Sequence, residues 1–434
     1  MNVFLQKVNI IEMAGIGFLL FFFIYGINFT FLPVYTSQLI ALGILTWWGF
    51  RLIANPDFEF RIDSGSQFLF TLWFILFVWV VFRTVHSGFR DFGFFVNIFL
   101  LFVQVFTGSL FFSAWFFRRG FSFDFMIRVI QVVIVVQAFF IIVYFLSPAF
   151  KEFTLRFIPE GGNVPALHPF RSRGLTHQAG ASLAAFQATG MLLSAYLITK
   201  RISWKWTVFD VLSMVVLLGS VMLTGRTGFV ILPFLLAYFG FYILFKKGLP
   251  RKIAYSGILL PLFGIGGFIA VQYIFQTYTG AEAGTDIFRT IGRWMFGEFQ
   301  QLGETGGSRT IDVLIEEHWF FPDRVGLLLF GDPNTYQVNR VDSDIGIIRR
   351  IFGIGIVGLS LTYLLVFSFF YRMAGATENA SERLLVICFG VWLFVLELKE
   401  PFVTDLRFAT LYMMMFCYVC LLPVQKFNRF KLSE

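Results

Sequence analysis

Charged residues are scarce in this sequence. Asp, Glu, Lys and Arg make up 14% of the 434 residues, whereas soluble domains carry roughly 25%. So small a polar fraction cannot cover the surface of a water-soluble globule of this length. Hydrophobic residues instead make up 57% of the chain, and Phe alone occupies 63 positions. The composition therefore excludes a soluble globular protein and indicates helices that face lipid.

Several sequence signals of cofactor chemistry are also missing. The three cysteines, Cys388, Cys417 and Cys420, lie in apolar stretches and have neither a paired framework nor metal-site spacing. The chain contains no phosphate-binding Gly-x4-Gly-Lys-Ser/Thr loop and no dinucleotide fingerprint. Its N-terminus has no cleavable signal pattern, so the first apolar stretch is expected to remain as a membrane span. We therefore expect neither a cofactor nor a metal.

Long apolar stretches recur along the chain, each of about the length that crosses a bilayer as a helix. We predict an all-α polytopic membrane protein, with residues 1–434 forming one integral-membrane domain of roughly twelve spans. Glycines such as Gly353 and Gly355 indicate close packing between spans. The predicted spans are residues 12–32, 34–54, 67–84, 92–117, 126–147, 178–199, 206–224, 227–245, 253–275, 345–371, 383–400 and 405–424.

Two connections between the predicted spans are much longer than the others, at residues 148–177 and 276–344. Loops of this length usually carry function. If the N-terminus is cytoplasmic, more than half of the 34 Lys and Arg residues fall in cytoplasmic segments, as the positive-inside rule requires. The second long loop then joins spans nine and ten on the outer side, and both termini are cytoplasmic. The formal charge of +8 is thereby explained without a nucleic-acid partner.

Arginines gather beside the predicted outer membrane edge. Arg171 and Arg173 precede the sixth span, and Arg226 lies in a turn too short for an ordinary loop. Arg309 lies in the longest loop, and Arg407 begins the last span. Guanidinium groups bind phosphate oxygens through a planar, bidentate fork, so several converging arginines would suit a lipid diphosphate. A single arginine at this depth is more often a snorkelling or ion-paired residue, but for Arg226 we favour a functional role.

Five residues on the same side could accept a proton, namely His177, Glu317, His318, Asp342 and Asp344. Each also has a structural explanation. His177 could begin a helix, and His318 lies beside two acids on the solvated face of a loop helix. The aspartates flank Ser343 directly before an apolar span, where a helix N-cap is expected. The residues alone do not distinguish these alternatives.

The order of these motifs resembles the O-antigen polymerase and O-antigen ligase superfamily of bacterial glycosyltransferases. Four pieces match in order: the pair Arg173-Gly174, the Thr-Gly-Arg-Thr-Gly turn around Arg226, the arginine, amphipathic helix and proline of residues 309–322, and the stretch DSDIGIIRRIFGIGIVG at 342–358. The resemblance covers about residues 165–425, and the earlier spans match in hydropathy only.

The resemblance implies an inverting, metal-independent glycosyl transfer in a GT-C-like fold on the periplasmic side of a bacterial inner membrane. Donor and acceptor would be oligosaccharide repeat units on undecaprenyl diphosphate, joined into O-antigen or a related polysaccharide. A chain-length regulator and a flippase would be further partners. The expected diphosphate contacts are Arg171, Arg173, Arg226, Arg309 and Arg407, and the expected proton acceptors are Asp342, Asp344, His318 and His177.

Two alternatives stay open. Ligases of the superfamily, which transfer finished polymer to lipid A core, carry His-Asn or similar residues where this chain has Asp342-Ser343-Asp344; this difference favours a polymerase. A flippase for lipid-linked oligosaccharides, which is a transporter, would also need many spans and cationic contacts. Transporters usually have two related halves with charges at mid-depth, and the sequence halves differ here, so we favour an enzyme.

Overall fold

The computed structural model describes residues 10–54, 62–88, 92–159, 171–177, 180–200, 203–245, 316–332 and 343–423. This part of the chain contains helices and no strands. Seven helices are long and apolar enough to cross a membrane, and three shorter apolar helices accompany them. The predicted class, an all-helical polytopic membrane protein, is therefore confirmed.

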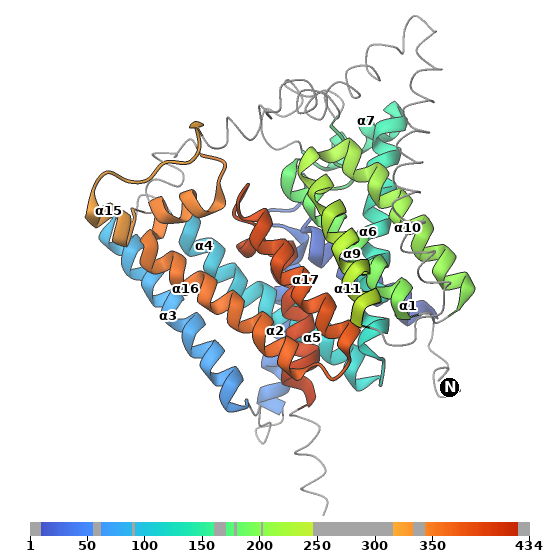
Figure 1. Ribbon diagram of the computed structural model, residues 1–434, viewed down its shortest axis with the longest axis horizontal. Coiled ribbons are helices and arrows are strands. Elements are labelled where there is room, and N and C mark those ends of the chain that lie inside the picture. Colours follow the sequence, from blue (N-terminus) through green and yellow to red (C-terminus); the bar gives the residue numbers. More distant parts are fainter. Residues whose placement is uncertain are drawn as a thin grey trace, which may run out of the picture.

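Successive long helices run back and forth between two ends of the bundle (Figure 1). We call one end the loop face; it holds residues 171–177, 316–332 and 397–405. The other end, where the described chain begins at Ile10 and ends at Pro423, is the terminal face. The helices are α1 (Ile10–Tyr25), α2 (Thr36–Ala54), α3 (Ser64–His86), α4 (Gly93–Leu100), η1 (Leu101–Val105), α5 (Phe106–Arg118), α6 (Phe123–Leu146), α7 (Pro148–Phe157), α9 (Ala181–Lys200), α10 (Trp204–Thr224), η2 (Arg226–Val230), α11 (Ile231–Phe245), α15 (Val325–Phe330), α16 (Gly346–Ala376), α17 (Ala380–Leu396), η4 (Phe402–Thr404), α18 (Leu406–Phe416) and η5 (Cys417–Leu421).

Each predicted span in the described part of the chain overlaps a helix, but α1 ends at Tyr25, before the end of the span predicted at 12–32. The spans predicted at 67–84 and 206–224, for example, lie within α3 and α10. The stretch 253–275 and most of the long loop 276–344 lie outside the described residues. The loop predicted at 148–177 begins with the helix α7, which was not predicted from sequence.

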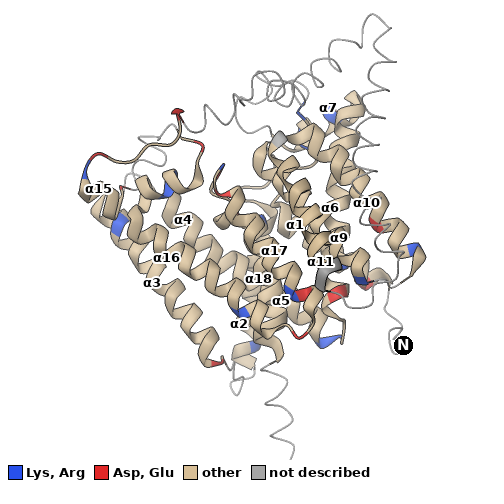
Figure 2. Ribbon diagram, viewed as in Figure 1, with Lys and Arg blue, Asp and Glu red and all other residues tan. Residues whose placement is uncertain are grey.

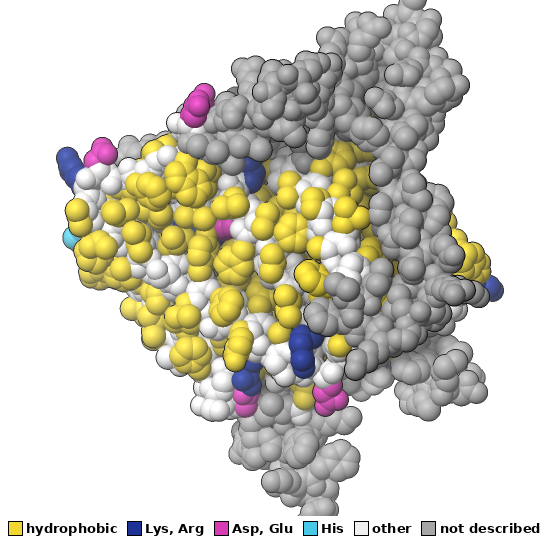
Figure 3. Space-filling view, viewed as in Figure 1, with side chains coloured by type: hydrophobic (Ala, Val, Ile, Leu, Met, Phe, Trp, Pro, Cys, Tyr) yellow, Lys and Arg dark blue, Asp and Glu magenta, His cyan; other side chains and the backbone are white. Residues whose placement is uncertain are grey.

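The face of the bundle seen in Figure 3 is apolar between its two ends. In the view of Figure 3, hydrophobic side chains cover the middle of the visible face, while most charged ones lie near its upper and lower edges. Figure 2 likewise shows Lys, Arg, Asp and Glu mainly toward the ends of the helices. This distribution suits a bundle surrounded by hydrocarbon at mid-height.

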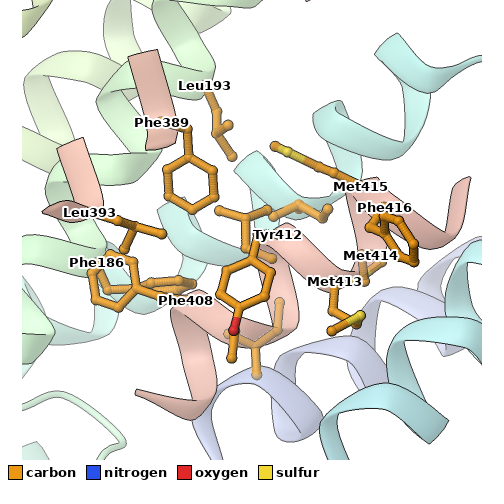
Figure 4. Close-up of a cluster of buried hydrophobic side chains, with 14 of the residues drawn as sticks. Phe186, Leu193, Phe389, Leu393, Phe408, Tyr412, Met413, Met414, Met415 and Phe416 are labelled. Carbon is orange, nitrogen blue, oxygen red and sulfur yellow. The ribbon is translucent and has the colours of Figure 1, made fainter. Parts of the chain in front are cut away.

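The centre of the bundle is a tightly packed apolar core around α18 (Figure 4). Phe408 of α18 makes an edge-to-face contact with Phe186 of α9, with ring centroids 5.3 Å apart. Three consecutive methionines, Met413–Met415, are buried there as well, and their unbranched side chains fill irregular gaps between neighbouring helices. Because α18 is buried along its length, its start at the loop face is fixed in position.

The path of α16 is broken at Gly355, where φ is 70° and ψ is 176°. Residues with side chains rarely adopt this conformation. The break frees backbone carbonyls, which need partners inside a membrane. Trp79 Nε1 of α3 donates to Ile354 O at 3.1 Å, and Asp332 N donates to Phe352 O at 2.6 Å. The break at Gly355 therefore lets the segment of residues 316–332 bond to the backbone of α16.

Candidate functional site

Charged side chains from several helices gather at the loop face. We call this group the loop-face charge cluster. It comes from the start of α9, the start of α16, the α17–α18 connection and the start of α18. Its members are Ser182, Asp344, Arg349, Lys399, Glu400, Asp405 and Arg407.

The α17–α18 connection lies directly against the start of α16. Gly346 N donates to Glu397 O at 3.1 Å. A β-carbon at Gly346 would collide with the carbonyl of Glu400 and with Pro401 N, so the close approach of the two backbones requires glycine. This contact brings the charges of residues 397–405 next to Asp344.

Asp405 and Arg407 form one half of the cluster. Asp405 caps α18 by accepting a hydrogen bond from Arg407 N at 3.0 Å. The Arg407 guanidinium donates to both carboxylate oxygens of Asp405, through Nε at 3.2 Å and Nη2 at 3.0 Å. Ser182 Oγ donates to Asp405 Oδ2 at 2.5 Å and accepts from Arg407. The Arg407 side chain is thereby held at the loop face with 19% of its surface exposed.

Asp344 forms the other half, beside two cations. Lys399 Nζ lies 2.7 Å from Asp344 Oδ2, and Arg349 Nη2 lies 3.5 Å from Asp344 Oδ1. Burial alone would raise the pKa of Asp344, but Lys399 and then Arg349 outweigh it and hold that pKa below its usual value. The side chain remains 45% exposed. Asp344 is therefore an accessible, ionised carboxylate at neutral pH.

Glu400 has the opposite electrostatic environment. Burial raises the pKa of Glu400, the negative charges of Asp344 and Asp405 raise it further, and Lys399 and Arg349 only partly offset them. A carboxyl group with a raised pKa is a stronger proton acceptor once ionised. Glu400 was not among the residues singled out from sequence, because its crowding by Asp344 arises from the fold.

Arg173 has a different environment from Arg407. It is 3% exposed, and its guanidinium donates to Ile158 O and Pro159 O, both at 2.7 Å, and to His177 O at 3.3 Å. His177 Nδ1 lies 2.8 Å from Pro159 O as well. These contacts fold residues 171–177 against the end of α7. Arg173 and His177 therefore order the loop.

The remaining predicted residues are placed less completely. Arg171 is half-buried in the same loop as Arg173. The backbone of Arg226 begins η2, directly after Gly225, which packs against Gly180 and Ala184 at the start of α9. His318 comes close to Asp344, because Ser343 Oγ donates to His318 O at 2.8 Å. Arg309, Asp342 and the side chain of Arg226 lie outside the described part of the structure.

A buried ion pair lies within the same elements and was not predicted from sequence. Arg350 Nε donates to Glu397 Oε1 at 2.5 Å, and both side chains are almost fully buried. Arg350 also donates to Thr404 Oγ1 at 2.9 Å, and Val403 N donates to Glu397 Oε2 at 2.9 Å. The pair fixes the α17–α18 connection onto α16, and thereby supports the charge cluster.

A second buried pair lies nearer the terminal face. Arg128 of α6 donates to both carboxylate oxygens of Asp210 of α10, at 2.9 Å for the Nη2–Oδ2 contact. Gln131 Nε2 bonds the same carboxylate at 2.9 Å and Ser194 Oγ at 2.8 Å. Neither Arg128 nor Asp210 was singled out from sequence, and the structure buries both between helices.

The described residues contain no group of three or more His, Cys, Asp and Glu side chains arranged to hold a metal ion. In the charge cluster, three cationic side chains can contact an anion while neighbouring carboxylates accept a proton. No family model matches this chain, and neither does any curated protein or solved structure. A functional assignment therefore depends on the chain's own residues.

Proposed function

We propose that this protein is a membrane-embedded glycosyltransferase that joins oligosaccharide repeat units carried on undecaprenyl diphosphate. The observation that carries the proposal is the loop-face charge cluster, in which Arg407 and the exposed carboxylate of Asp344 lie at one edge of an apolar helical bundle. A diphosphate on a membrane lipid sits at that depth, between hydrocarbon and water. Fixed guanidinium groups there can contact its oxygens.

The proposed topology is the one expected from span hydropathy and the distribution of Lys and Arg. We assign about twelve spans in a GT-C-like arrangement, with residues 253–275 as the ninth span and the loop 276–344 on the outer side. The loop face is then periplasmic in a bacterial inner membrane, and the termini are cytoplasmic.

In the proposed reaction, a hydroxyl group of the acceptor sugar attacks the anomeric carbon of the donor. The bond from that carbon to the diphosphate oxygen breaks, the diphosphate keeps the electron pair, and a carboxylate takes the hydroxyl proton. Negative charge grows on the leaving diphosphate, so cations fixed beside it lower the barrier. No metal is required for this chemistry.

The residues divide into three proposed roles. Arg407, Arg226, Arg309 and Arg171 contact the diphosphate. Asp344, Asp342, His318 and His177 are the proton acceptors proposed from sequence, and the structure adds Glu400 as a candidate because of its raised pKa. Arg173 acts as a positioning residue, because its guanidinium is directed at backbone carbonyls.

A flippase is the second candidate, favoured by one observation. The Arg128–Asp210 pair is buried between helices, and charged residues inside membrane helices often mark a transport path. Against it, Asp210 is fully engaged by Arg128 and Gln131, as expected of a structural contact.

The test is reconstitution of the purified protein in liposomes with lipid-diphosphate-linked repeat units as the sole substrate. A ladder of longer lipid-linked glycans supports the polymerase. Product that forms only after lipid A core is added indicates a ligase, and unmodified substrate moved between leaflets indicates a flippase. Arg226→Ala should abolish chain growth although the protein still inserts normally, and undiminished polymer would remove Arg226 from the proposed site.

A further inference from the structure

A cavity of about 270 Å³ lies at the loop face between the end of α1 and α7. Its walls are mainly aromatic, and include Phe22, Phe29, Phe31, Phe153 and Phe157. Thr154 also lines it, but its hydroxyl is engaged, because Thr154 Oγ1 donates to Lys151 O at 2.8 Å. Water enters a cavity stably only where polar groups can bind it, so this cavity suits hydrocarbon.

The helix α7 has the pattern of an interfacial helix. Phe153, Thr154 and Phe157 share the face that lines the cavity, and at 3.6 residues per turn Lys151 and Arg156 flank that face on opposite sides. Such helices lie along the membrane surface, with the apolar face among acyl chains and the cations at phosphate level. Lys151 Nζ lies 5.8 Å from the Tyr144 ring centroid, at the end of α6.

One wall of the cavity is joined to the bundle, and another side of the cavity is open to the surroundings. Thr30 N donates to Phe157 O at 2.8 Å, which joins the segment after α1 to the end of α7. Two of the aromatic side chains remain largely exposed, Phe31 at 68% and Phe153 at 56%. A chain from the surrounding membrane can therefore reach the cavity without entering the charge cluster, which shares no lining residue with it.

We propose that this cavity binds one acyl chain of an anionic phospholipid, with the phosphate group beside Lys151 and Arg156. The apolar walls offer no hydrogen-bond partner for a sugar or a diphosphate, so the occupant is a hydrocarbon chain. The volume is slightly below the 300–1,000 Å³ typical of pockets for whole ligands, as expected when only part of one chain enters. The two cations select a negatively charged headgroup. This site does not depend on the proposed glycosyl transfer.

The test measures lipid binding to the full-length, delipidated protein by native mass spectrometry, with phosphatidylglycerol and phosphatidylcholine as probes. The wild type should retain phosphatidylglycerol preferentially. Lys151→Gln and Arg156→Gln should each weaken that binding by about fivefold, as expected for a cation near an anionic lipid surface. Leu175→Trp, which fills the cavity, should abolish it. Phe139→Ala, on the exposed surface of α6 outside the cavity, serves as the matched control.

Three results would overturn the inference. These are equal binding of both phospholipids by the wild type, undiminished binding by Leu175→Trp, and displacement of phosphatidylglycerol by a polyprenyl phosphate at equal concentration. The last result would show that the site belongs to another lipid. If Leu175→Trp does not fold, the Lys151→Gln/Arg156→Gln double variant decides, because it changes only charges beside the cavity.

Discussion

The two faces of the bundle use charge in different ways. At the terminal face, ion pairs join separate helices: Glu12 with Arg119, Asp63 with Arg372, and Lys200 with both Asp124 and Glu382. At the loop face, Asp344 is shared by two cations, and Glu400 is crowded by two other acids. At the terminal face, a structural role in joining helices is sufficient to explain the ion pairs. At the loop face, the repulsion between neighbouring carboxylates lowers stability, and such clusters are concentrated at functional sites.

The buried ion pairs near the two faces are alike, so the difference between the faces lies in their more exposed charges. Arg350–Glu397 supports the loop face and Arg128–Asp210 lies nearer the terminal face, and all four side chains are largely or fully buried. We therefore expect changes to these pairs to affect stability equally. Changes to the exposed charges should separate the two faces by activity.

The largest effect is expected from Glu397→Ala. Removing the carboxylate leaves Arg350 charged and buried, which should lower the free energy of unfolding by about 3–5 kcal/mol. Asp210→Ala should cost a similar amount, measured for both variants by denaturant unfolding in detergent. Replacing both members, as in Arg350→Met/Glu397→Met, should recover most of the loss. Unchanged unfolding of Glu397→Ala would contradict the structural role of the pair.

Arg407→Gln should give the next largest effect, on chain growth. Loss of one fixed charge beside the leaving diphosphate should lower kcat by about 10²–10³-fold, measured in the reconstituted assay with equal amounts of folded protein. Arg407→Lys should retain part of the activity, since it keeps the charge but not the bidentate geometry. Activity equal to wild type in Arg407→Gln would remove this residue from the diphosphate site.

Gly355→Ala tests how the loop face is held. The backbone at Gly355 suits glycine alone, so alanine should cost about 1–3 kcal/mol. A β-carbon there would also collide with the backbone of Leu329, which should detach α15 from α16. Faster hydrogen exchange across residues 316–332, with unchanged exchange at the terminal face, is the expected signature. Gly240→Ala, in α11 where a β-carbon meets open space, is the control.

Lys399→Met should shift a pH profile without abolishing activity. If Glu400 accepts the proton, it must be ionised, so the rate rises with pH through its pKa. Burial raises that pKa and Lys399 lowers it, so removing the cation should move the acidic limb of the rate profile to higher pH. An unmoved limb would argue against Glu400 as the proton acceptor.

The smallest effect is expected at the terminal face, from Arg119→Gln. Its ion pair with Glu12 is substantially exposed, and exposed pairs contribute about 0–1 kcal/mol. Chain growth should be unchanged within error in the same reconstituted assay. A loss comparable with that of Arg407→Gln would remove the functional distinction between the faces.

Sequence patterns predicted the helices better than the site. Span length and hydropathy located α3 and α10 closely, because the bilayer imposes a simple length and composition on each helix. The same patterns missed α7, which is too short and too polar on one side to resemble a span. The same patterns did not predict the break at Gly355. A glycine that allows close helix packing and a glycine that interrupts a helix can both occur within an apolar stretch, so the sequence does not distinguish them.

For the site, sequence identified residue types but could not distinguish their environments. Arg173 and Arg407 each lie near the start of a predicted span, yet the first is directed at backbone carbonyls and the second at Asp405 and Ser182. The importance of Glu400 depends on Asp405, five residues along the chain, and on Asp344, which only the fold brings near it. The roles of these residues depend on contacts between segments that are distant in sequence. The periodicity of apolar residues along the chain carries no information about such contacts.

The most direct test of the central claim is to locate a bound lipid diphosphate. A photoreactive undecaprenyl diphosphate, with the reactive group beside the phosphates, would be cross-linked to the reconstituted protein and the modified peptides identified. We predict modification within residues 343–350 and 397–407 at the loop face, and loss of it in Arg407→Gln. Modification confined to terminal-face peptides, such as those around Lys200 and Arg119, would contradict the assignment of the loop-face charge cluster as the diphosphate site.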